Sequence, residues 1–334
     1  MDRNLALELV RVTEAAALAA ARFMGKGDPI AADRAAAAAM ALAIKGVKVT
    51  GHIVIGERED IPGAELCAGR SVGSGEEPEV DLALDPLEGM CSLADGQGNA
   101  ISAIALAPKG SMRSFSAPMM RKIAVGPEAA GMIDIDEPVF DNLVRIAEAR
   151  RVYVEDLTVA ILRKERHEEL IEEVRRAGAR IELVRDGDLA STFAAAVPGT
   201  GIDVVLGTGD ASHAVISAAA MACLGGDLQG RIVIPGEDEE KGSGERIAGS
   251  LIEGTLQSGE GDEPDTGRIY RIEDLSGTDN IMFAATGVSR CAFLDGVNFR
   301  PGGAVTHSIA LRSVSGTIRH LRTEHFFDKE PDYT

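Results

Sequence analysis

The chain begins with two stretches in which apolar residues recur at the spacing of a helix. They cover about residues 3–24 and 30–44, are rich in Ala and Leu, and are separated by the polar sequence Gly-Lys-Gly-Asp-Pro. Apolar side chains at every third or fourth position form one face of a helix, so both stretches are predicted to be helical. The first stretch also carries charged residues that favour a surface helix over a membrane span, among them Glu8, Arg11, Glu14 and Arg22.

Short apolar runs separated by Gly-rich turns follow, and such runs are typical of strands. We expect four of them to lie in one sheet, at residues 53–55, 80–84, 101–106 and 122–125. From residue 157 onward strand-like and helix-like runs alternate, covering residues 157–162, 167–177, 180–184, 189–196, 203–206 and 212–224. Alternating strands and helices predict a parallel sheet with right-handed crossovers, so a second domain is predicted to begin near residue 150.

This division predicts an N-terminal α+β domain of residues 1–149 and a C-terminal α/β domain of residues 150–334. Near the end, residues 304–327 contain Ser-Val-Ser-Gly-Thr between two alternating runs, which indicates a β-hairpin. Residues 236–265 are rich in Gly, Glu and Asp and are predicted to be a solvated loop, although residues 246–253 could be helical.

The composition narrows the classes of function. The 334 residues are 45% hydrophobic and 26% charged, as in ordinary globular proteins, and the net charge is −19. This acidity disfavours binding to nucleic acids and anionic membranes, whereas a local cation or metal ion still permits a small phosphorylated ligand. The four cysteines are widely spaced and the N-terminus lacks a secretory apolar segment, so we expect reduced thiols and a cytoplasmic protein.

The segment Asp-Leu-Ala-Leu-Asp-Pro-Leu-Glu-Gly-Met, at residues 81–90, carries the clearest chemical signal. An apolar strand runs directly into two carboxylates, Asp85 and Glu88. Pro86 favours an extended residue before it, so the strand is expected to stop at Asp85, with Glu88 folding back beside it. Adjacent carboxylates repel each other unless a proton or cation lies between them, and Mg²⁺ and Mn²⁺ prefer oxygen ligands. A metal site and a solvated acidic turn both fit this segment taken alone.

Two further carboxylates lie at similar places in the pattern. Glu57 ends the run His-Ile-Val-Ile-Gly, where Gly56 allows the backbone to turn without a steric penalty. Asp33 lies in the opening turn of the second predicted helix. A metal ligand fits Asp33 there, and so does an ordinary charge that the helix dipole favours.

The second half of the chain contains candidate contacts to phosphate and sugar. Lys164 and Arg166 flank Glu165, so on a strand they would share one face and bind a phosphate, whereas at a helix start they would be routine surface charges. The sequence Asp-Gly-Asp at residues 186–188 could bind sugar hydroxyls or cap the next helix. The sequence Gly-Thr-Gly-Asp at residues 207–210 precedes a helix and could form a loop that binds an anion.

Nine stretches, colinear over nearly the whole chain, carry a family resemblance. They are residues 25–28 with Ala32 and Asp33, residues 53–57, 80–89, 96–100 and 141–143, Lys164 with Arg166, and residues 186–188, 226–231 and 279–287. In this order they resemble the class II, glpX-type fructose-1,6-bisphosphatases, within the lithium-sensitive, metal-dependent sugar phosphatase superfamily.

The resemblance implies a two-domain, layered α/β/α/β/α fold with the active site between the domains. It implies Mg²⁺ or Mn²⁺ bound by Asp33, Glu57, Asp85 and Glu88, the last three being the catalytic carboxylates. It also implies contacts to a small phosphorylated sugar from Gly89, Lys164, Arg166, Asp186 and Asp188. Divalent cations in such a site would activate water and neutralise the phosphoryl group. A role in carbohydrate metabolism, including gluconeogenesis, and a homodimer or homotetramer are implied as well.

Several positions differ from the family pattern that the resemblance supplies. Met90 replaces a threonine that helps to position water and phosphate, and Met119 replaces a tyrosine that contacts the substrate. Asp210 replaces a glycine on the substrate side, and His213 replaces a glutamate of the metal set. Imidazole can bind Mn²⁺, Fe²⁺ or Zn²⁺, so His213 is a candidate metal ligand, and a packed histidine at a helix start fits it equally well.

Two functions are consistent with these residues. The first is a divergent metal-dependent phosphatase with an altered active site, acting on a sugar phosphate or bisphosphate other than, or in addition to, fructose 1,6-bisphosphate. The alternative is a family member that lacks efficient phosphatase activity and binds a phosphorylated sugar for regulation or for a different metal-assisted reaction. A purely structural role fits poorly, because buried carboxylates without a cation are costly.

Overall fold

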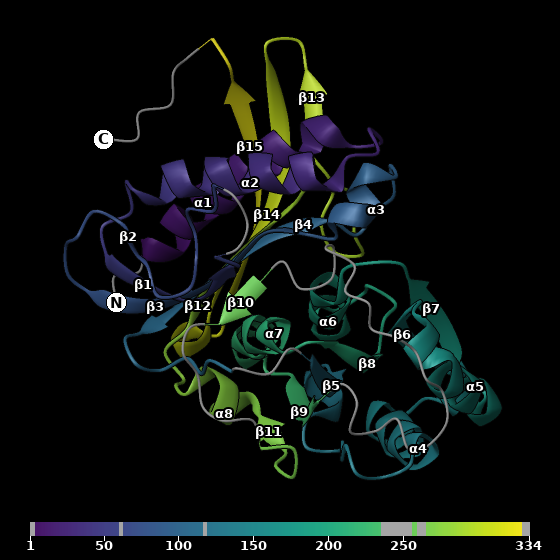
Figure 1. Cartoon of the computed structure of the whole chain (residues 1–334). Helices are drawn as coiled ribbons and strands as arrows, with labels where there is room; N and C mark the ends of the chain where they lie inside the picture. The colour runs from purple at the N-terminus through teal and green to yellow at the C-terminus, as the bar shows by residue number, and fades with distance from the viewer. Residues whose placement is uncertain (1–3, 60–62, 116–118, 235–255, 259–264, 329–334) are drawn as a thin grey trace.

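The computed structural model describes residues 4–59, 63–115, 119–234, 256–258 and 265–328, which form two sheets and several helices (Figure 1). The strands of the larger sheet are β1 (Thr50–Glu57), β2 (Ser71–Val72), β3 (Glu79–Glu88), β4 (Ile101–Pro108), β10 (Leu256–Ser258), β12 (Met282–Gly287), β13 (Asn298–Arg300), β14 (Gly303–Arg312) and β15 (Thr317–Phe326). Their order is β10-β1-β3-β4-β12-β14-β13, with β2 paired to β1 and β15 paired to β14.

The smaller sheet contains β5 (Met119–Val125), β6 (Thr158–Leu162), β7 (Arg180–Val184), β8 (Val204–Asp210), β9 (Asp227–Val233) and β11 (Tyr270–Arg271). Their order is β11-β9-β5-β8-β6-β7. Strand β6 runs parallel to β7 and β8, but β5 runs antiparallel to β8 and β9. The parallel pairing predicted for the strands at residues 157–162, 180–184 and 203–206 is confirmed in β6, β7 and β8. The placement of β5 with the earlier strands is wrong, because an apolar run predicts a strand but not its partner.

The α-helices are α1 (Leu5–Ala20), α2 (Pro29–Ile44), α3 (Met90–Ala94), α4 (Val139–Arg150), α5 (Glu168–Ala177), α6 (Asp188–Ala196), α7 (Ala211–Leu224) and α8 (Ile272–Ser276). Short 3₁₀ helices are η1 (Ala21–Phe23), η2 (Pro127–Ala129), η3 (Val154–Asp156), η4 (Glu165–His167) and η6 (Ser313–Ser315). In the described part of the chain, no helix is both long enough and apolar enough to cross a membrane.

Three apolar cores separate the layers. One core joins α1 and α2 to one face of the larger sheet, a second surrounds α6 and α7 between the sheets, and a third joins α4 and α5 to the smaller sheet. Figure 1 shows the same succession from top to bottom. The predicted layered α/β/α/β/α architecture is confirmed.

Strand β4 shows how one sheet serves two of these cores. Ala103 and Ala105 belong to the core around α6 and α7, whereas Ile104 and Leu106 belong to the core beneath α1 and α2. Successive side chains of a strand point to opposite faces, so this alternation follows directly from the sequence. Both faces are buried, which is why the strand reads as a continuous apolar run.

The two N-terminal helices lie where the periodicity predicts them. Asp28 precedes α2 and its Oδ1 accepts a hydrogen bond from Ala31 N at 2.9 Å, and Pro29 occupies the first helical position. Not every charge of α1 faces solvent, however. Glu14 is 5% exposed and its carboxylate accepts a hydrogen bond from Thr306 Oγ1 at 2.8 Å, which joins α1 to β14.

Strands from both sides of residue 150 pair in each sheet, so the sheets themselves do not divide at that residue. Strand β5 precedes residue 150 and lies in the smaller sheet, whereas β12 to β15 return to the larger one. The predicted C-terminal hairpin is confirmed as β14, η6 and β15. The possible helix at residues 246–253 lies outside the described residues.

Candidate metal centre

Strand β3 delivers two carboxylates to the space between the sheets. The strand does not stop at Asp85 as predicted but continues to Glu88, with a register shift between the two residues. Pro86 has no N–H to donate to the neighbouring strand. It lies at the irregularity in the pairing, so the strand continues past it. Asp85 Oδ1 accepts a hydrogen bond from Leu87 N at 3.0 Å, which holds the carboxylate at this bend.

Asp33 and Glu57 approach the same point from α2 and from the end of β1. Both are buried, at 7% and 4% exposure. Glu57 Oε2 accepts a hydrogen bond from Leu66 N at 2.9 Å, although burial still raises its pKa. Burial, together with the nearby Asp85 and Glu57 carboxylates, raises the pKa of Asp33 to about 7. The structure therefore concentrates negative charge here, which a cation would relieve.

Glu88 has one satisfied oxygen and one unsatisfied oxygen. Its Oε1 accepts a hydrogen bond from Leu189 N at 2.8 Å, whereas the buried Oε2 has no hydrogen-bond partner among the described residues. A β carbon on Gly187, which has a φ of 91°, would lie 2.7 Å from that Oε2, so only glycine permits this approach. Burial, with Asp188 and Asp85 adding repulsion, raises the pKa of Glu88 well above its ordinary value.

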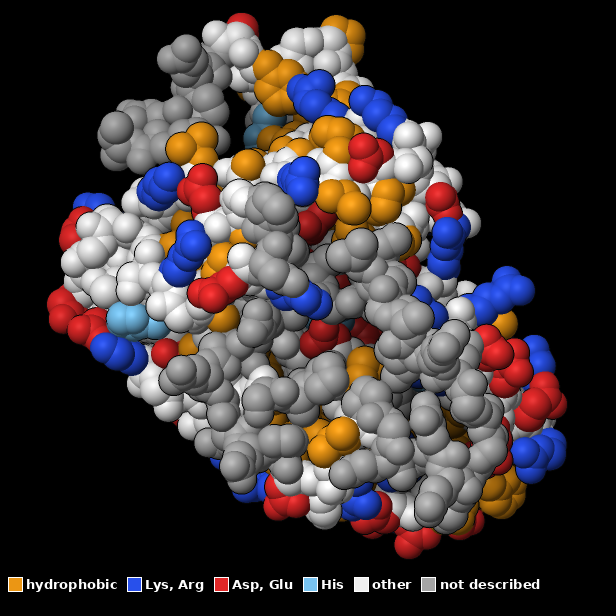
Figure 2. Space-filling model, in the orientation of Figure 1, with side chains coloured by type: hydrophobic (Ala, Val, Ile, Leu, Met, Phe, Trp, Pro, Cys, Tyr) orange, Lys and Arg blue, Asp and Glu red, His pale blue; other side chains and the backbone are white. Residues whose placement is uncertain are grey.

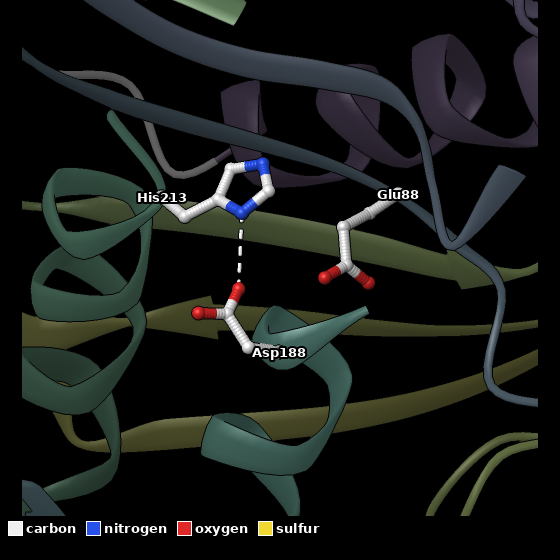
Figure 3. Close-up of side chains that lie close together, drawn as sticks. All are labelled: Glu88, Asp188 and His213. Carbon is white, nitrogen blue, oxygen red and sulfur yellow. Dashed lines mark hydrogen bonds and ion pairs between the residues drawn. The ribbon is translucent and has the colours of Figure 1, made fainter. Parts of the chain in front are cut away.

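Facing Glu88 are Asp188, the first residue of α6, and His213, in the first turn of α7 (Figure 3). His213 Nδ1 lies 3.0 Å from Asp188 Oδ1, and its Nε2 lies 3.3 Å from Asp85 Oδ2. Burial alone would lower the pKa of His213, but the hydrogen bonds to these two carboxylates raise it well above its usual value. His213 thus links a carboxylate of the larger sheet to one of α6.

Lys122, on β5, is a charged member of this cluster that the sequence analysis did not select. It is 6% exposed and pairs with the second oxygen of Asp188. Burial disfavours the Asp188 anion, but Lys122 and His213 hold the pKa of Asp188 below its usual range. The sequence signal that could have identified Lys122 is its place directly before the apolar run Ile123 to Val125. A lysine in a buried strand is rare unless it is paired with an acidic group.

The residues after Glu88 serve the backbone and the core. Gly89, with a φ of 82°, precedes α3, and a β carbon there would lie 2.8 Å from Asn99 O. The Met90 side chain is 5% exposed and belongs to the core beneath α1 and α2. Met119 begins β5, where its backbone pairs with Asp210.

The sequence at residues 207–210 does not form the expected anion-binding loop. These residues belong to β8 and pair with β5, so the pairing of the two strands occupies this stretch of backbone. Asp210 caps α7 instead, with its Oδ1 accepting a hydrogen bond from Ser212 N at 2.7 Å. Burial raises the pKa of Asp210.

Lys164 and Arg166 lie just beyond β6, which ends at Leu162, so they are not on a strand; Lys164 precedes η4 and Arg166 lies within it. Arg166 Nε donates a hydrogen bond to Thr208 O at 3.1 Å. The backbone N–H of Thr208 in turn donates to His167 Nε2 at 2.8 Å. His167 Nδ1 lies 2.8 Å from Leu162 O, so this buried ring joins β6 to β8. Burial lowers the pKa of His167.

Asp186 lies in the turn between β7 and α6. Its Oδ2 accepts a hydrogen bond from Cys91 N at 2.9 Å, which ties this turn to α3. Gly187, not an aspartate side chain, precedes α6, and no side-chain cap is formed there. Of the two roles considered for residues 186–188, helix capping is therefore wrong.

Three side chains meet the requirements of a metal site. One ligand atom from each of Glu88, Asp188 and His213 lies within 4.8 Å of the others. The Oε2 atom of Glu88 has no hydrogen-bond partner among the described residues, and burial, with repulsion from neighbouring carboxylates, raises the pKa of Glu88 and of Asp33. Carboxylate oxygens with one imidazole nitrogen suit a divalent cation, so the residues present fit such an ion.

Comparison with known proteins agrees with this chemistry. The family model described as "Bacterial fructose-1,6-bisphosphatase, glpX-encoded" matches residues 3–325. Among curated proteins, fructose-1,6-bisphosphatase 1 class 2 of Escherichia coli strain K12 is 37% identical over 337 residues, covering 99% of this chain and 98% of its own length. A fructose-1,6-bisphosphatase class 2 of Shigella flexneri has the same identity and coverage.

These relatives are named fructose-1,6-bisphosphatases, and the similarity covers nearly the whole chain, both sheets included. A match over nearly the full length, joined to a buried acidic centre between the layers, leaves one assignment: the chain belongs to the family of bacterial class II fructose-1,6-bisphosphatases.

Proposed function

We propose that this protein is a metal-dependent phosphatase that hydrolyses a phosphate monoester of a small phosphorylated sugar, either a monophosphate or a bisphosphate. The observation that carries the proposal is the convergence of Glu88, Asp188 and His213 within 4.8 Å, with Glu88 Oε2 buried and unsatisfied in the described structure. Such a carboxylate is costly unless a cation binds it. Family membership supplies the reaction class.

We assign Glu88, Asp188 and His213 as ligands of one divalent ion, with Asp33, Glu57 and Asp85 forming the acidic wall beside it. An imidazole ligand suits Mn²⁺ or Zn²⁺ better than Mg²⁺, which prefers oxygen, so Mn²⁺ is our first choice and Mg²⁺ the second. To bind a metal, His213 would release its hydrogen bond to either Asp188 or Asp85. The ion would supply charge neutralisation for the phosphoryl group and a more acidic water.

The protein's own cations then have separate tasks. Lys122 is paired with Asp188 and keeps that carboxylate ionised for its ligand role. Lys164 and Arg166 lie on the short segment after β6, and we assign them to the phosphate group of the substrate. Thr208, on β8, accepts a hydrogen bond from Arg166 and donates one to His167. These two hydrogen bonds hold the segment after β6 against β8.

The substituted positions support an altered active site. His213 would offer a nitrogen ligand to a bound metal ion, and Asp210 adds a carboxylate where the family resemblance has glycine. Met90 is packed into the apolar core, so it offers no hydroxyl to water or phosphate. We therefore assign the activity to phosphorylated sugars as a class, with fructose 1,6-bisphosphate as one member to be tested.

A second function rests on one observation. Lys122, Asp188, His213 and Asp85 form a continuous chain of ion pairs, so the cluster is already partly neutralised by the protein. A protein that binds phosphorylated sugars without efficient hydrolysis would tolerate this arrangement, together with the apolar Met90.

A phosphate-release assay separates the two functions. The wild type is tested on a panel of sugar phosphates and bisphosphates with Mg²⁺, Mn²⁺ and Zn²⁺ each added after chelation. Release that depends on the metal, and that is lost in Asp85→Asn, supports the phosphatase. The matched control is Asp81→Asn on the same strand, because Asp81 Oδ2 accepts a hydrogen bond from Met112 N at 3.0 Å, and the amide oxygen of Asn can replace it. No release with any metal, accompanied by sugar-phosphate binding, selects the second function.

A further inference from the structure

Strand β8 extends beyond one of its neighbours in the smaller sheet. The pairing of β6 with β8 covers residues 159–160 opposite residues 204–205, whereas β8 continues along β5 as far as Asp210. Beyond Val205, the backbone groups on the edge of β8 that faces β6 therefore need hydrogen-bond partners from another part of the chain. Thr208 lies on this stretch of β8.

Side chains from the segment after β6 supply the partners of Thr208. The Thr208 N–H donates to Nε2 of His167 at 2.8 Å, and the Thr208 carbonyl accepts a hydrogen bond from Arg166 Nε at 3.1 Å. The other ring nitrogen of His167, Nδ1, lies 2.8 Å from Leu162 O at the end of β6. The ring thus spans the space between the two strands and takes the place of the hydrogen bonds that a longer β6 would form.

These partners fix the protonation state of the ring. A backbone N–H can only donate, so Nε2 of His167 accepts and carries no proton. A carbonyl can only accept, so Nδ1 carries the proton and donates it to Leu162 O. Helix α5 begins directly after the ring and presents mixed acidic and basic side chains at the lower right of Figure 2, where Figure 1 places it. The ring itself is 2% exposed, so water has little access to replace either hydrogen bond.

Glycine admits the ring to this position. Gly207 has a φ of 147°, and a β carbon there would lie 3.1 Å from Cε1 and from Nε2 of His167. Strand β8 is also held on its other side, because it pairs with β5 and because a β carbon on Gly209 would lie 2.5 Å from Asp188 Oδ2. The end of β8 is therefore the fixed partner, and the segment after β6 depends on the ring for its position.

We propose that His167 is a positioning residue for the phosphate of the substrate: as a neutral ring, it anchors the segment that carries Lys164 and Arg166 to Thr208. This inference rests on the proposed function, in which these two side chains bind that phosphate. The hydrogen bond from Arg166 Nε to Thr208 O sets the plane of the guanidinium, so its orientation depends on how the segment lies against β8.

Protonation of the ring would break this anchor, because the cation cannot accept the Thr208 N–H. Burial lowers the pKa of His167; the positive charge of Arg166 acts in the same direction, and Asp188 on α6 opposes it. The contacts from β6 and β8 come from uncharged residues, namely Leu162, Gly207 and Thr208. The ring is therefore neutral at pH 7 and gains its second proton only below pH 6.5. A new positive charge by itself would strengthen phosphate binding, whereas loss of the anchor weakens it, so the sign of the change in acid separates the two effects.

Two substitutions separate the two hydrogen bonds of the ring. In His167→Asn the amide nitrogen takes the place of Nδ1 and can donate to Leu162 O, but the shorter side chain does not reach Thr208 N. In His167→Gln the terminal oxygen takes the place of Nε2 and can accept from Thr208 N. With Mn²⁺ and fructose 1,6-bisphosphate, His167→Asn should raise KM about tenfold and leave kcat within about twofold, because the phosphate is bound in the ground state and in the transition state alike. His167→Gln should keep KM within about twofold of the wild type. The control is His320→Gln, an exposed histidine on β15, which should change neither value.

A pH profile and a binding measurement without metal complete the test. As the pH falls from about 7.5 to about 5.5, KM of the wild type should rise relative to KM of His167→Gln, and this ratio cancels the titration of the substrate phosphate itself. Calorimetric titration of chelated protein with fructose 1,6-bisphosphate should give the same order of Kd values in the absence of hydrolysis. Nitrogen NMR spectra of the ring, assigned by comparison with His167→Gln, should show a neutral ring with its proton on Nδ1 at pH 7.

The outcomes distinguish this inference from the proposed function. Equal KM and Kd values for the Asn and Gln variants, with hydrolysis intact, would overturn the positioning role alone, and so would tighter phosphate binding in acid. Weaker binding by His167→Asn than by His167→Gln, without phosphate release from any variant, would support the positioning role and contradict the phosphatase. Absence of both binding and release would overturn both. A ring that is cationic, or protonated on Nε2, at pH 7 would overturn the positioning role whatever the activity.

Discussion

Replacing Glu88 by Gln tests whether this buried carboxylate serves a metal ion. The substitution keeps the oxygen that accepts a hydrogen bond from Leu189 N and removes a charge that faces Asp188 and Asp85. The neutral amide also removes the cost of burying an anion beside two other carboxylates. We therefore expect the metal-free variant to be more stable than the wild type, by about 1 kcal/mol, the free energy of a pKa shift of roughly one unit.

The sign of the pH dependence follows from the raised pKa of Glu88. The folded protein holds a proton on this group more tightly than the unfolded chain, so the stabilising contribution is complete below the ordinary value of 4.5. That contribution is lost as the pH rises through the higher folded pKa. Gln does not titrate, so the advantage of the variant in the metal-free state should grow as the pH rises.

Addition of metal should reverse the order of stability. An ion at 100 times its Kd stabilises the folded wild type by about 2.7 kcal/mol, which corresponds to a rise of about 4 °C in Tm. The variant lacks one anionic ligand and should lose most of that rise. Calorimetry of chelated protein, before and after addition of Mn²⁺, measures both effects.

Glu14→Gln is the matched control for this experiment. Glu14 is also a buried glutamate, but its carboxylate accepts a hydrogen bond from Thr306 Oγ1 far from the metal cluster. It should leave the metal-dependent rise in Tm unchanged. The reasoning would be refuted if Glu88→Gln destabilised the metal-free protein and retained the full response to Mn²⁺, because Glu88 would then act only as a partner of Leu189.

Three further outcomes are expected. Met90→Thr should raise turnover of sugar bisphosphates if the missing hydroxyl limits hydrolysis; unchanged or lower turnover in steady-state kinetics would show that the pocket has been adapted as a unit. The pKa of His167 is lowered by burial, so its contribution to stability should be lost as the pH falls below 6.5, and urea unfolding of His167→Gln should show a smaller loss. Thr306→Val removes a hydrogen bond to buried Glu14 and should cost about 1–3 kcal/mol in chemical denaturation, whereas Thr306→Ser should cost less.

Local sequence rules account for much of the fold. The periodicity of Ala and Leu predicted α1 and α2, and Asp28 with Pro29 marks where α2 begins. The hairpin of β14 and β15 follows from two alternating runs around a short turn. These features depend on neighbouring residues, so the chain alone specifies them. The resemblance to a family added the layered architecture, which no local pattern contains.

The partners of the strands were not predictable in the same way. Strand β5 joins the smaller sheet. Strands β12 to β15 belong to the larger sheet, although they follow all strands of the smaller sheet in the sequence. An apolar run predicts a strand whichever strand it pairs with. The pairing of strands that are distant in the sequence is therefore decided by the packing of the layers. The same limit explains the mixed direction of the smaller sheet.

The residues of the candidate site were likewise predictable only in part. Asp85 and Glu88 are three residues apart at the end of an apolar run, so the sequence by itself determined that two carboxylates lie close together, while a metal site and a solvated acidic turn both fitted them. Only the tertiary structure decided that Asp188 and His213 face Glu88, and that buried Lys122 pairs with Asp188. These groups come from β3, β5, α6 and α7, and their charges interact only because folding removes water from between the layers.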